Sequence, residues 1–266
     1  MNSNSQLIQS KVLMLNKRLA GAKSCDFTIL EFSKSKPYLC GIIHPAVQLP
    51  ALSKIQMNMD TKELVARGLE LPLMEAFYTI QGEGRFTGHS AYFIRLGGCD
   101  VGCVWCDVKD SWDSGNWPVL SIEKIVEDAL AFPGRLVVIT GGEPLMYDLG
   151  PLTALLKAKG FTTNIETSGA HPFSGDFDWV CFSPKKFKKP HDSIYKKADE
   201  LKVVVFHHSD FAFAEAHAEK VNSSCELRLQ PEWSKAEKYT PEIIDFVKSH
   251  PKWKISLQTH KFMDIP

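Results

Sequence analysis

Three cysteines within eight residues give the strongest chemical signal in the sequence: Cys99, Cys103 and Cys106 follow a C-x3-C-x2-C spacing. Three thiolates on one short loop can bind three irons of a [4Fe–4S] cluster, which normally takes four cysteine ligands. No fourth cysteine follows at close spacing, so the fourth iron would be open to another ligand. Spacing alone leaves three alternatives: a zinc site completed by a distant histidine, a set of redox thiols, or a chance cluster.

A glycine turn is the second chemical signal. Thr140-Gly141-Gly142-Glu143-Pro144 follows the apolar run 136–139. Glycines let a ligand approach the backbone closely, and the free peptide groups together with the glutamate could hold an ammonium or carboxylate group. Turns use these residue types routinely, so the segment is weak evidence alone. Its position after a strand, downstream of the cysteine loop, indicates a ligand site beside the cluster.

Composition excludes several classes of protein. The chain has 266 residues, 44% hydrophobic and 23% charged, with formal net charge +0, which is ordinary for a globular protein. Neutral balance gives no support for a nucleic-acid partner, and no apolar run approaches the ~20 residues that cross a membrane. Seven cysteines, an odd number, argue against a secreted disulfide framework and for a reducing, cytoplasmic location. We therefore expect the scattered Cys25, Cys40, Cys181 and Cys225 to be free thiols.

Strand-like and helix-like segments alternate along most of the chain. Strands are predicted at 90–96, 136–140, 162–166, 179–183, 201–206, 226–230 and 254–258, and helices at 121–131, 151–159, 210–221 and 241–249. The first helix has apolar residues at helical periodicity with Ser121 as N-cap. The last is predicted to start at Pro241, the first helical position, with Thr240 as its cap.

This alternation predicts an α/β fold with a mainly parallel sheet. About 200 patterned residues fall short of the ~250 of a full eight-fold barrel, so we expect an abbreviated, open, partial (β/α) barrel. Ligands collect at the carboxyl ends of strands in such folds. Cys99, Gly141 and Glu166 each come at the end of a different predicted strand and should lie together.

The first 70 residues differ from the rest, so we expect two regions: a poorly patterned N-terminal extension, 1–70, and a core domain, 71–266. Residues 1–25 contain basic residues and no acidic residue, which faintly resembles a transit peptide. A disordered extension, or a start codon placed upstream of Met57 or Met59, are the alternative explanations.

The cysteine loop together with the Gly-Gly-Glu-Pro turn resembles the radical S-adenosylmethionine (SAM) superfamily. The resemblance implies a partial (β/α) barrel of the radical SAM type, in which the amino and carboxylate groups of SAM bind the open iron. It also implies that an electron from the cluster cleaves SAM to a 5′-deoxyadenosyl radical, which abstracts hydrogen from the substrate. Trp105 fits the superfamily's aromatic position, and simple packing is the alternative role.

Further segments resemble the 7-carboxy-7-deazaguanine synthase family of queuosine and 7-deazaguanine biosynthesis. The matching segments are 75–84, 93–99, 164–169, 182–185, 200–203, 229–231 and 256–266. The resemblance implies a carbon–nitrogen lyase that converts 6-carboxy-5,6,7,8-tetrahydropterin to 7-carboxy-7-deazaguanine, releases ammonia and regenerates SAM. A flavodoxin-type electron donor and a homodimer are also implied.

Site residues carry over by position. The resemblance implies SAM contacts by Trp105, Asp107, Gly142, Glu143, Ser183, Pro184, Lys185 and Gln230. It implies substrate contacts by Ile80, Gln81, Gly82, Glu83, Arg95, Thr140, Glu166, His260 and Pro266. Arg95 can pair with a carboxylate through two hydrogen bonds. The alternatives left open are a solvent ion pair for Arg95, a brace for the tail at His260, a frayed terminus at Pro266 and SAM as the ligand of Glu166.

One position departs from the family. Family members often have a Thr or Ser two residues after the last cysteine, and its hydroxyl binds Mg²⁺, whereas this chain has Val108. Asp107 or Asp110 could supply hard oxygen ligands instead, Lys109 could replace the cation, or the need for Mg²⁺ could be reduced. The Mg²⁺ ligand therefore stays unassigned.

Two other functions are weighed against this one. A radical SAM activase that makes a glycyl radical on a partner protein would share the cysteine loop and the glycine turn. It would not need the Gln81-Gly-Glu-Gly84 segment or the 258–261 tail segment. A non-catalytic zinc-binding module would need only the cysteines and a histidine.

Overall fold

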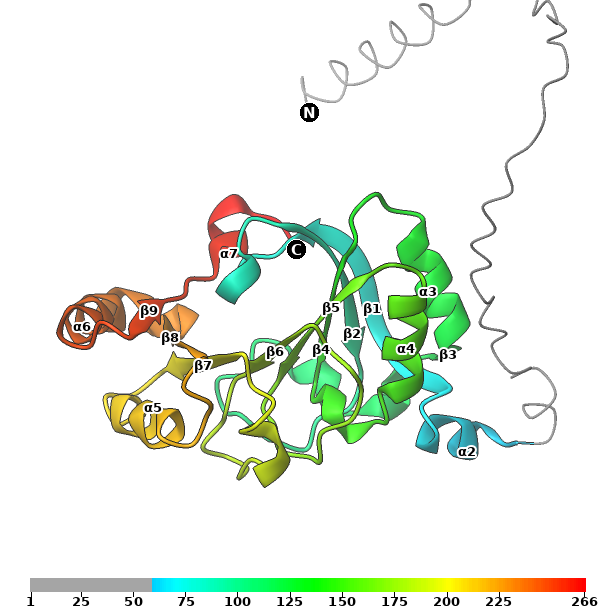
Figure 1. Cartoon of the computed structure of the whole chain (residues 1–266), viewed down its shortest axis with the longest axis horizontal. Coiled ribbons are helices and arrows are strands. Elements are labelled where there is room, and N and C mark those ends of the chain that lie inside the picture. Colours follow the sequence, from blue (N-terminus) through cyan, green and yellow to red (C-terminus); the bar gives the residue numbers. More distant parts are fainter. Residues whose placement is uncertain (1–58) are drawn as a thin grey trace, which may run out of the picture. The chain divides into compact units, whose positions relative to one another are not determined.

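A nine-stranded sheet forms the framework of residues 59–266, the part of the chain that this computed structural model describes (Figure 1). Its strands are β1 Glu70–Ile80, β2 Ser90–Leu96, β3 Val119–Ser121, β4 Leu136–Gly141, β5 Thr162–Thr167, β6 Trp179–Phe182, β7 Glu200–Val205, β8 Glu226–Pro231 and β9 Trp253–Ile255. The order is β3-β1-β2-β4-β5-β6-β7-β8-β9, parallel from β2 to β9 and antiparallel at β1. The outer strands β3 and β9 do not pair, so the expected open, partial barrel is confirmed.

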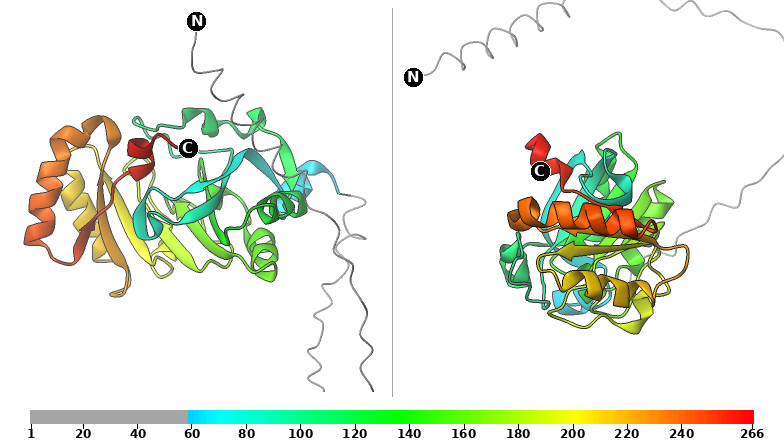
Figure 2. Two further views of the ribbon diagram at one scale, coloured as in Figure 1. Left: turned by 90° about the horizontal axis from the view of Figure 1, so that it is seen from above. Right: turned by 90° about the vertical axis from the view of Figure 1, so that its left-hand side faces the viewer.

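The helices are α2 Thr61–Ala66, α3 Ile122–Leu130, α4 Gly150–Ala158, α5 Asp210–Ala218, α6 Ala236–Ser249 and α7 Thr259–Met263. Helices α3, α4, α5 and α6 cover the outside of this sheet, while α2 precedes β1 and α7 lies beside the C-terminus (Figures 1 and 2). Short 3-10 helices occupy Gly84–Phe86, Lys109–Trp112, Ser114–Asn116, Pro144–Met146, Asp192–Ile194 and Trp233–Lys235. No helix among the described residues is long and apolar enough to span a bilayer.

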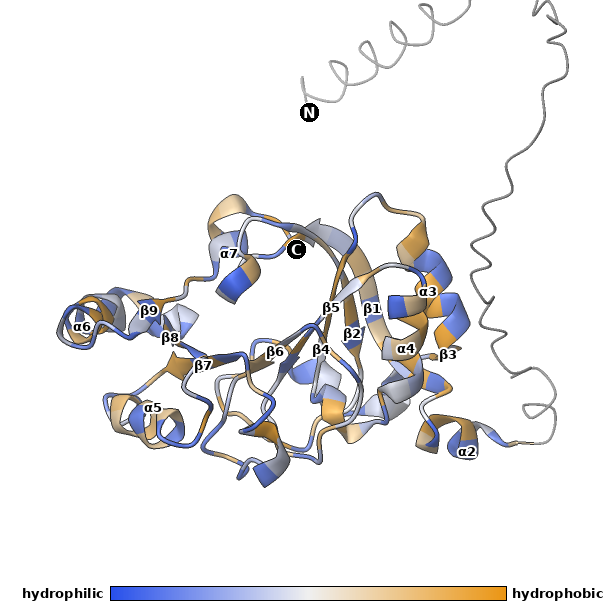
Figure 3. Cartoon of the chain, viewed as in Figure 1, coloured by the Kyte–Doolittle hydropathy of each residue, from blue (hydrophilic) through white to orange (hydrophobic). Residues whose placement is uncertain are grey.

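Helix α3 shows how local sequence places a helix on the sheet. The Ser121 hydroxyl accepts a hydrogen bond from the Lys124 N–H at 3.3 Å, as its predicted capping role requires. The buried Ile122, Ile125 and Val126 share one face of the helix, while hydrophilic residues occupy other positions of α3 (Figure 3). Burying each such aliphatic side chain contributes roughly 1.5–3 kcal/mol.

The core lies between the helices and the sheet. Fully buried residues on neighbouring strands, among them Ile94, Ile139 and Ile165, pack against the helices. The predicted free thiols at Cys181 and Cys225 are confirmed, and both are buried. Cys25 and Cys40, the basic residues of 1–25 and the question of the start codon lie outside the described residues.

The predicted start of the last long helix is wrong. Helix α6 begins at Ala236 and contains Pro241 inside it. Proline removes a backbone hydrogen bond at an interior position. The extra turn buries Tyr239 on the same helix face as Ile243, four residues later, and this burial offsets the lost bond.

Two strands, β1 and β3, and two short helices, α2 and α7, are absent from the predicted set. Strand β1 does not alternate, since Leu71, Pro72 and Leu73 are all buried, and β3 has only three residues. Helix α2 lies within the segment regarded as unpatterned and is capped by Asp60. Strand β9 ends at Ile255, not 258, and Gln258 instead donates to Glu83 at 2.9 Å.

Candidate functional site

A cavity of about 270 Å³ lies at the carboxyl ends of the parallel strands. The predicted site residues that line it are Ile80, Gln81, Gly82, Glu83, Arg95, Cys99, Cys103, Trp105, Cys106, Asp107, Thr140, Gly142, Glu143, Glu166, Ser183, Lys185, Gln230, His260 and Pro266. Pro184 is the exception, and it lines a second cavity that shares Trp105 and Lys185 with the first. The predicted meeting of Cys99, Gly141 and Glu166 is confirmed.

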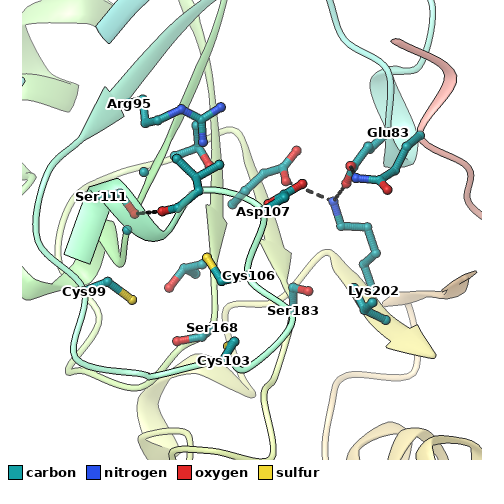
Figure 4. A pocket seen from close by; sticks show the side chains of 18 of the residues that line it. Glu83, Arg95, Cys99, Cys103, Cys106, Asp107, Ser111, Ser168, Ser183 and Lys202 are labelled. Carbon is teal, nitrogen blue, oxygen red and sulfur yellow. Dashed lines mark hydrogen bonds and ion pairs between the residues drawn. The ribbon is translucent and has the colours of Figure 1, made fainter. Parts of the chain in front are cut away.

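The three cysteines face this cavity from one loop (Figure 4). Backbone hydrogen bonds hold the start of the loop, from Gly98 N to the Ser111 carbonyl at 2.6 Å and from Cys99 N to the Trp112 carbonyl at 3.1 Å. Burial raises the pKa of the Cys103 thiol to about 11, so binding of a metal cluster would have to displace its proton. Within residues 59–266, no three His, Cys, Asp or Glu side chains are placed to hold a single metal ion.

The glycine turn packs directly on the cysteine loop. Gly142 N donates to the Leu96 carbonyl and Glu143 N to the Gly98 carbonyl, both at 2.9 Å. A Cβ atom at Gly142 would lie 2.1 Å from the Gly98 oxygen, so only glycine permits this approach. Gly142 is therefore required by its close contact with the cysteine loop, whether or not a ligand also approaches it.

The hydrogen bonds of the Glu143 carboxylate are made within the protein. It is 1% exposed and accepts from Ser168 N at 2.8 Å and Leu145 N at 3.0 Å. The hydroxyls of Thr167 and Ser168 donate to its two oxygens as well. These bonds join the glycine turn to the end of β5 and leave little of the carboxylate for an ammonium group. Thr167 and Ser168 were not predicted as site residues, although their segment carries the family resemblance.

Opposite the cysteines, a buried lysine joins two carboxylates (Figure 4). Lys202, with 3% of its side chain exposed, donates to Glu83 at 2.5 Å and to Glu166 at 2.9 Å. Burial raises the pKa of Glu83, but the charge and hydrogen bond of Lys202 outweigh it and lower this pKa to about 2. Gln81 donates to Glu166 at 2.8 Å. The sequence placed Lys202 on a strand near the site but assigned it no role, and the available signal was a lone lysine among the apolar residues of 201–205.

Arg95 lines the cavity while pairing with Glu75 on the neighbouring strand, its register partner. The Nε atom donates to the Glu75 carboxylate at 2.6 Å. Within residues 59–266, its two terminal nitrogens donate no hydrogen bond. The ion pair weighed as an alternative is thus present, and it leaves the outer edge of the guanidinium for a ligand.

The C-terminal segment closes one side of the cavity, beside the loop that follows β1 (Figures 1 and 2). Thr259 N donates to the Gly82 carbonyl at 2.9 Å, and a Cβ atom at Gly82 would lie 2.3 Å from Nδ1 of His260. The Pro266 carbonyl accepts from the Thr79 hydroxyl at 3.4 Å. These contacts place Pro266 at the cavity wall and disfavour a frayed terminus.

Lys185 and Trp105 form the wall between the two cavities. The Lys185 ammonium donates to the carbonyl of Ser183 at 2.8 Å and to its hydroxyl at 2.6 Å, and lies 5.6 Å from the centre of the Trp105 ring. Burial lowers the pKa of Lys185. Gln230 accepts from Ser256 at 2.7 Å. Amide, hydroxyl and ammonium groups thus lie beside the cysteine loop.

Three comparisons with known proteins bear on the family and the fold. A family model described as "Radical SAM superfamily" matches residues 93–217. A 7-carboxy-7-deazaguanine synthase from Flavobacterium psychrophilum is 54% identical over 211 residues, which cover 78% of this chain and 100% of the relative. The chain belongs to the 7-carboxy-7-deazaguanine synthase family. A synthase from Synechocystis is 45% identical over 73% of this chain and 93% of its own length.

A solved structure supports the same placement. The crystal structure of QueE from Escherichia coli matches with a TM-score of 0.66 at 34% identity, covering 75% of this chain and 99% of that chain. Both the predicted family and the radical SAM fold are confirmed. The chain is a radical SAM enzyme, and nothing in the comparisons favours the activase or the zinc-binding module.

Valine occupies the position at which the synthase resemblance implies a Mg²⁺ ligand. Val108 lines the cavity without a side-chain oxygen, while Lys109 and Asp110 do not line it. Asp107 pairs with Lys261 at 3.2 Å. The Ser111 hydroxyl lines the cavity and donates to the Val108 carbonyl at 2.6 Å, which leaves its oxygen lone pairs free.

Proposed function

We propose that this member of the synthase family converts 6-carboxy-5,6,7,8-tetrahydropterin to 7-carboxy-7-deazaguanine with release of ammonia. One observation carries the proposal: a single cavity is lined by the three-cysteine loop on one side and by carboxylates, amides and Arg95 on the other. When bound, an iron–sulfur cluster and SAM supply radical chemistry that abstracts hydrogen. The protein's task is to hold one C–H bond of the substrate within reach of it.

The residues present suit the cofactors. Cys99, Cys103 and Cys106 would hold the [4Fe–4S] cluster, leaving one iron for SAM. The SAM-binding groups in this proposal are Trp105, Asp107, Gly142, Glu143, Ser183, Pro184, Lys185 and Gln230. Since the Glu143 carboxylate already accepts four hydrogen bonds, its proposed part is to shape the backbone that meets SAM.

The opposite wall suits a carboxylated pterin. Glu83 and Glu166 can accept from ring N–H groups, and Gln81 offers an amide beside them. Arg95 can pair its outer nitrogens with the substrate carboxylate. Ile80, Gly82, Thr140, His260 and Pro266 complete the proposed substrate contacts.

Partners and setting are part of the proposal. A flavodoxin-type donor would deliver electrons near Val104, which is 63% exposed between two of the cysteines. We also propose a homodimer, a core domain spanning 71–266 and a cytoplasmic location. The free thiols Cys181 and Cys225 support the reducing compartment. Size-exclusion chromatography with light scattering tests the dimer.

Anaerobic reconstitution tests the function. The full chain is loaded with iron and sulfide, reduced, and incubated with SAM and 6-carboxytetrahydropterin, and the deazaguanine product is measured by mass spectrometry. Cys103→Ala should lose SAM cleavage, while Cys225→Ala, which alters a buried thiol outside the cavity, should retain it. An intact cluster that cleaves SAM but yields no deazaguanine would overturn the proposal.

A further inference from the structure

Lys202 lies between two carboxylates that come from distant parts of the chain. Glu83 follows β1 and Glu166 lies in β5, and both accept from the Lys202 ammonium, on β7. In each carboxylate, one oxygen accepts from Lys202 and the other accepts from the side-chain amide of a glutamine. Gln258 donates to Oε1 of Glu83 at 2.9 Å, and Gln81 donates to Oε1 of Glu166 at 2.8 Å.

The charges do not balance within this group. Two carboxylates and one ammonium leave one net negative charge in a buried site. A carboxylate has about four acceptor positions, and the bonds above leave some of them free on Glu83 and Glu166. Both residues line the cavity, so the group presents acceptors to a ligand and favours one that brings N–H donors. Neither carboxylate can donate while it is ionised.

We propose that Lys202 is a positioning residue that keeps Glu83 and Glu166 as a fixed, ionised pair of acceptors selecting a substrate edge with adjacent N–H donors. This inference rests on the proposed function, because the amino-pyrimidinone edge of a pterin carries such donors. Lys202 itself need not touch the substrate, since its ammonium is occupied by the two carboxylates.

The surroundings of Lys202 support this role. The titratable groups that face it or its two partners are Glu83, Glu166, Cys181, Lys185, Glu200 and His260. Glu200 is paired with Arg228 at 3.4 Å, and burial raises the pKa of the Cys181 thiol. The neighbouring cation Lys185 donates instead to Ser183, at 2.8 and 2.6 Å, so it does not replace the Lys202 ammonium. Without Lys202, burial would raise the pKa of Glu83. A protonated carboxyl donates where it formerly accepted, which would repel an N–H group of the substrate.

Lys202→Met in the reconstituted full chain tests the inference. We expect the KM for 6-carboxytetrahydropterin to rise about tenfold or more, while SAM affinity and substrate-free SAM cleavage stay unchanged. The kcat/KM of this variant should also fall on the acid side of the pH profile, where wild type is flat. The matched control is Lys254→Met, because Lys254 also pairs with a glutamate, Glu226, at 3.0 Å but is 52% exposed.

A second variant distinguishes a positioning role of Lys202 from simple charge balance. It also provides the test if Lys202→Met folds poorly. Lys202→Met with Glu166→Gln removes one negative charge along with the positive one. We expect it to recover thermal stability but to keep the raised KM. Recovery of a wild-type KM in the double variant, or an unchanged KM in a folded Lys202→Met, overturns the inference. If the wild-type protein makes the deazaguanine product, the proposed function stands whatever the Lys202 variants show. If the wild-type protein makes no product, both the proposed function and the role of Lys202 are overturned.

Discussion

The Nε atom of Arg95 donates to the Glu75 carboxylate at 2.6 Å across the β1–β2 pair. Glu75 thereby fixes one edge of the guanidinium, and the other edge, with two nitrogens, remains for a ligand. An arginine can meet a carboxylate with two parallel hydrogen bonds, while a lysine offers a single charged point. The pair on neighbouring strands thus orients the group proposed to recognise the substrate carboxylate.

Arg95→Lys is expected to raise the KM for the carboxylated pterin about tenfold or more, because the two-bond geometry is lost. SAM affinity should not change, since Arg95 lies on the wall proposed for substrate. Steady-state kinetics and equilibrium SAM binding measure the two effects. Arg135→Lys, at an exposed residue outside the cavity, is the control. An equal loss of SAM affinity in Arg95→Lys would count against its assignment.

Glu143→Gln is expected to lower the free energy of unfolding by about 1–3 kcal/mol, because an amide nitrogen would face N–H and O–H donors that now meet a carboxylate. Urea unfolding of the variant measures this change. The exposed Glu237 of α6 provides the control Glu237→Gln, which should differ little from wild type. A Glu143→Gln protein as stable as wild type would mean that the short contacts to Thr167 and Ser168 contribute little.

Removal of Mg²⁺ by a chelator should leave wild-type turnover unchanged, since Val108 offers no oxygen ligand. Val108→Thr replaces a methyl group by a hydroxyl, and the side chain keeps nearly the same size. Hydroxyl oxygen is a ligand that Mg²⁺ accepts. Turnover of this variant should therefore rise with added Mg²⁺. The control is Val119→Thr, at a position on β3 that is 38% exposed. Strong Mg²⁺ dependence of the wild type would point to ligands other than residue 108.

Acid should weaken the fold through Glu83. Its folded-state pKa of about 2 lies below the ordinary value of 4.5, so the ionised form stabilises the fold. This contribution is fully present above pH 4.5 and is lost as the pH falls from 4.5 toward 2, by at most about 3 kcal/mol. Urea unfolding at several pH values should show a shallower acid loss in Glu83→Gln than in wild type. Parallel curves for the two proteins would exclude this linkage.

Local signals predicted much of the fold correctly. Strand β2 has the predicted bounds, and the Ser121 cap of α3 depends only on residues within one turn. Strand β1 was missed because its buried residues follow tertiary contacts instead of alternation. The start of α6 was wrong because burial of Tyr239 outweighs the local preference of Pro241.

The site shows the same division. The cysteine spacing and the glycine turn are local, so they could be identified from sequence. The contact between Lys202 and Glu83 joins residues 119 positions apart, and no local pattern reports it. The commitment of Glu143 to Thr167 and Ser168 likewise depends on how β4 and β5 lie side by side.

The contact of Gly142 with Gly98 bears on how the cluster is assembled. The start of the cysteine loop is hydrogen-bonded on one side to the 3-10 turn Lys109–Trp112 and on the other to the glycine turn, through the Leu96 and Gly98 carbonyls. Little backbone entropy therefore remains to be lost when iron and sulfide enter. Zinc fingers, by contrast, fold only as they bind metal. Insertion of the cluster into this protein should therefore require little rearrangement of the backbone. The main groups to be displaced are the protons of the cysteine thiols.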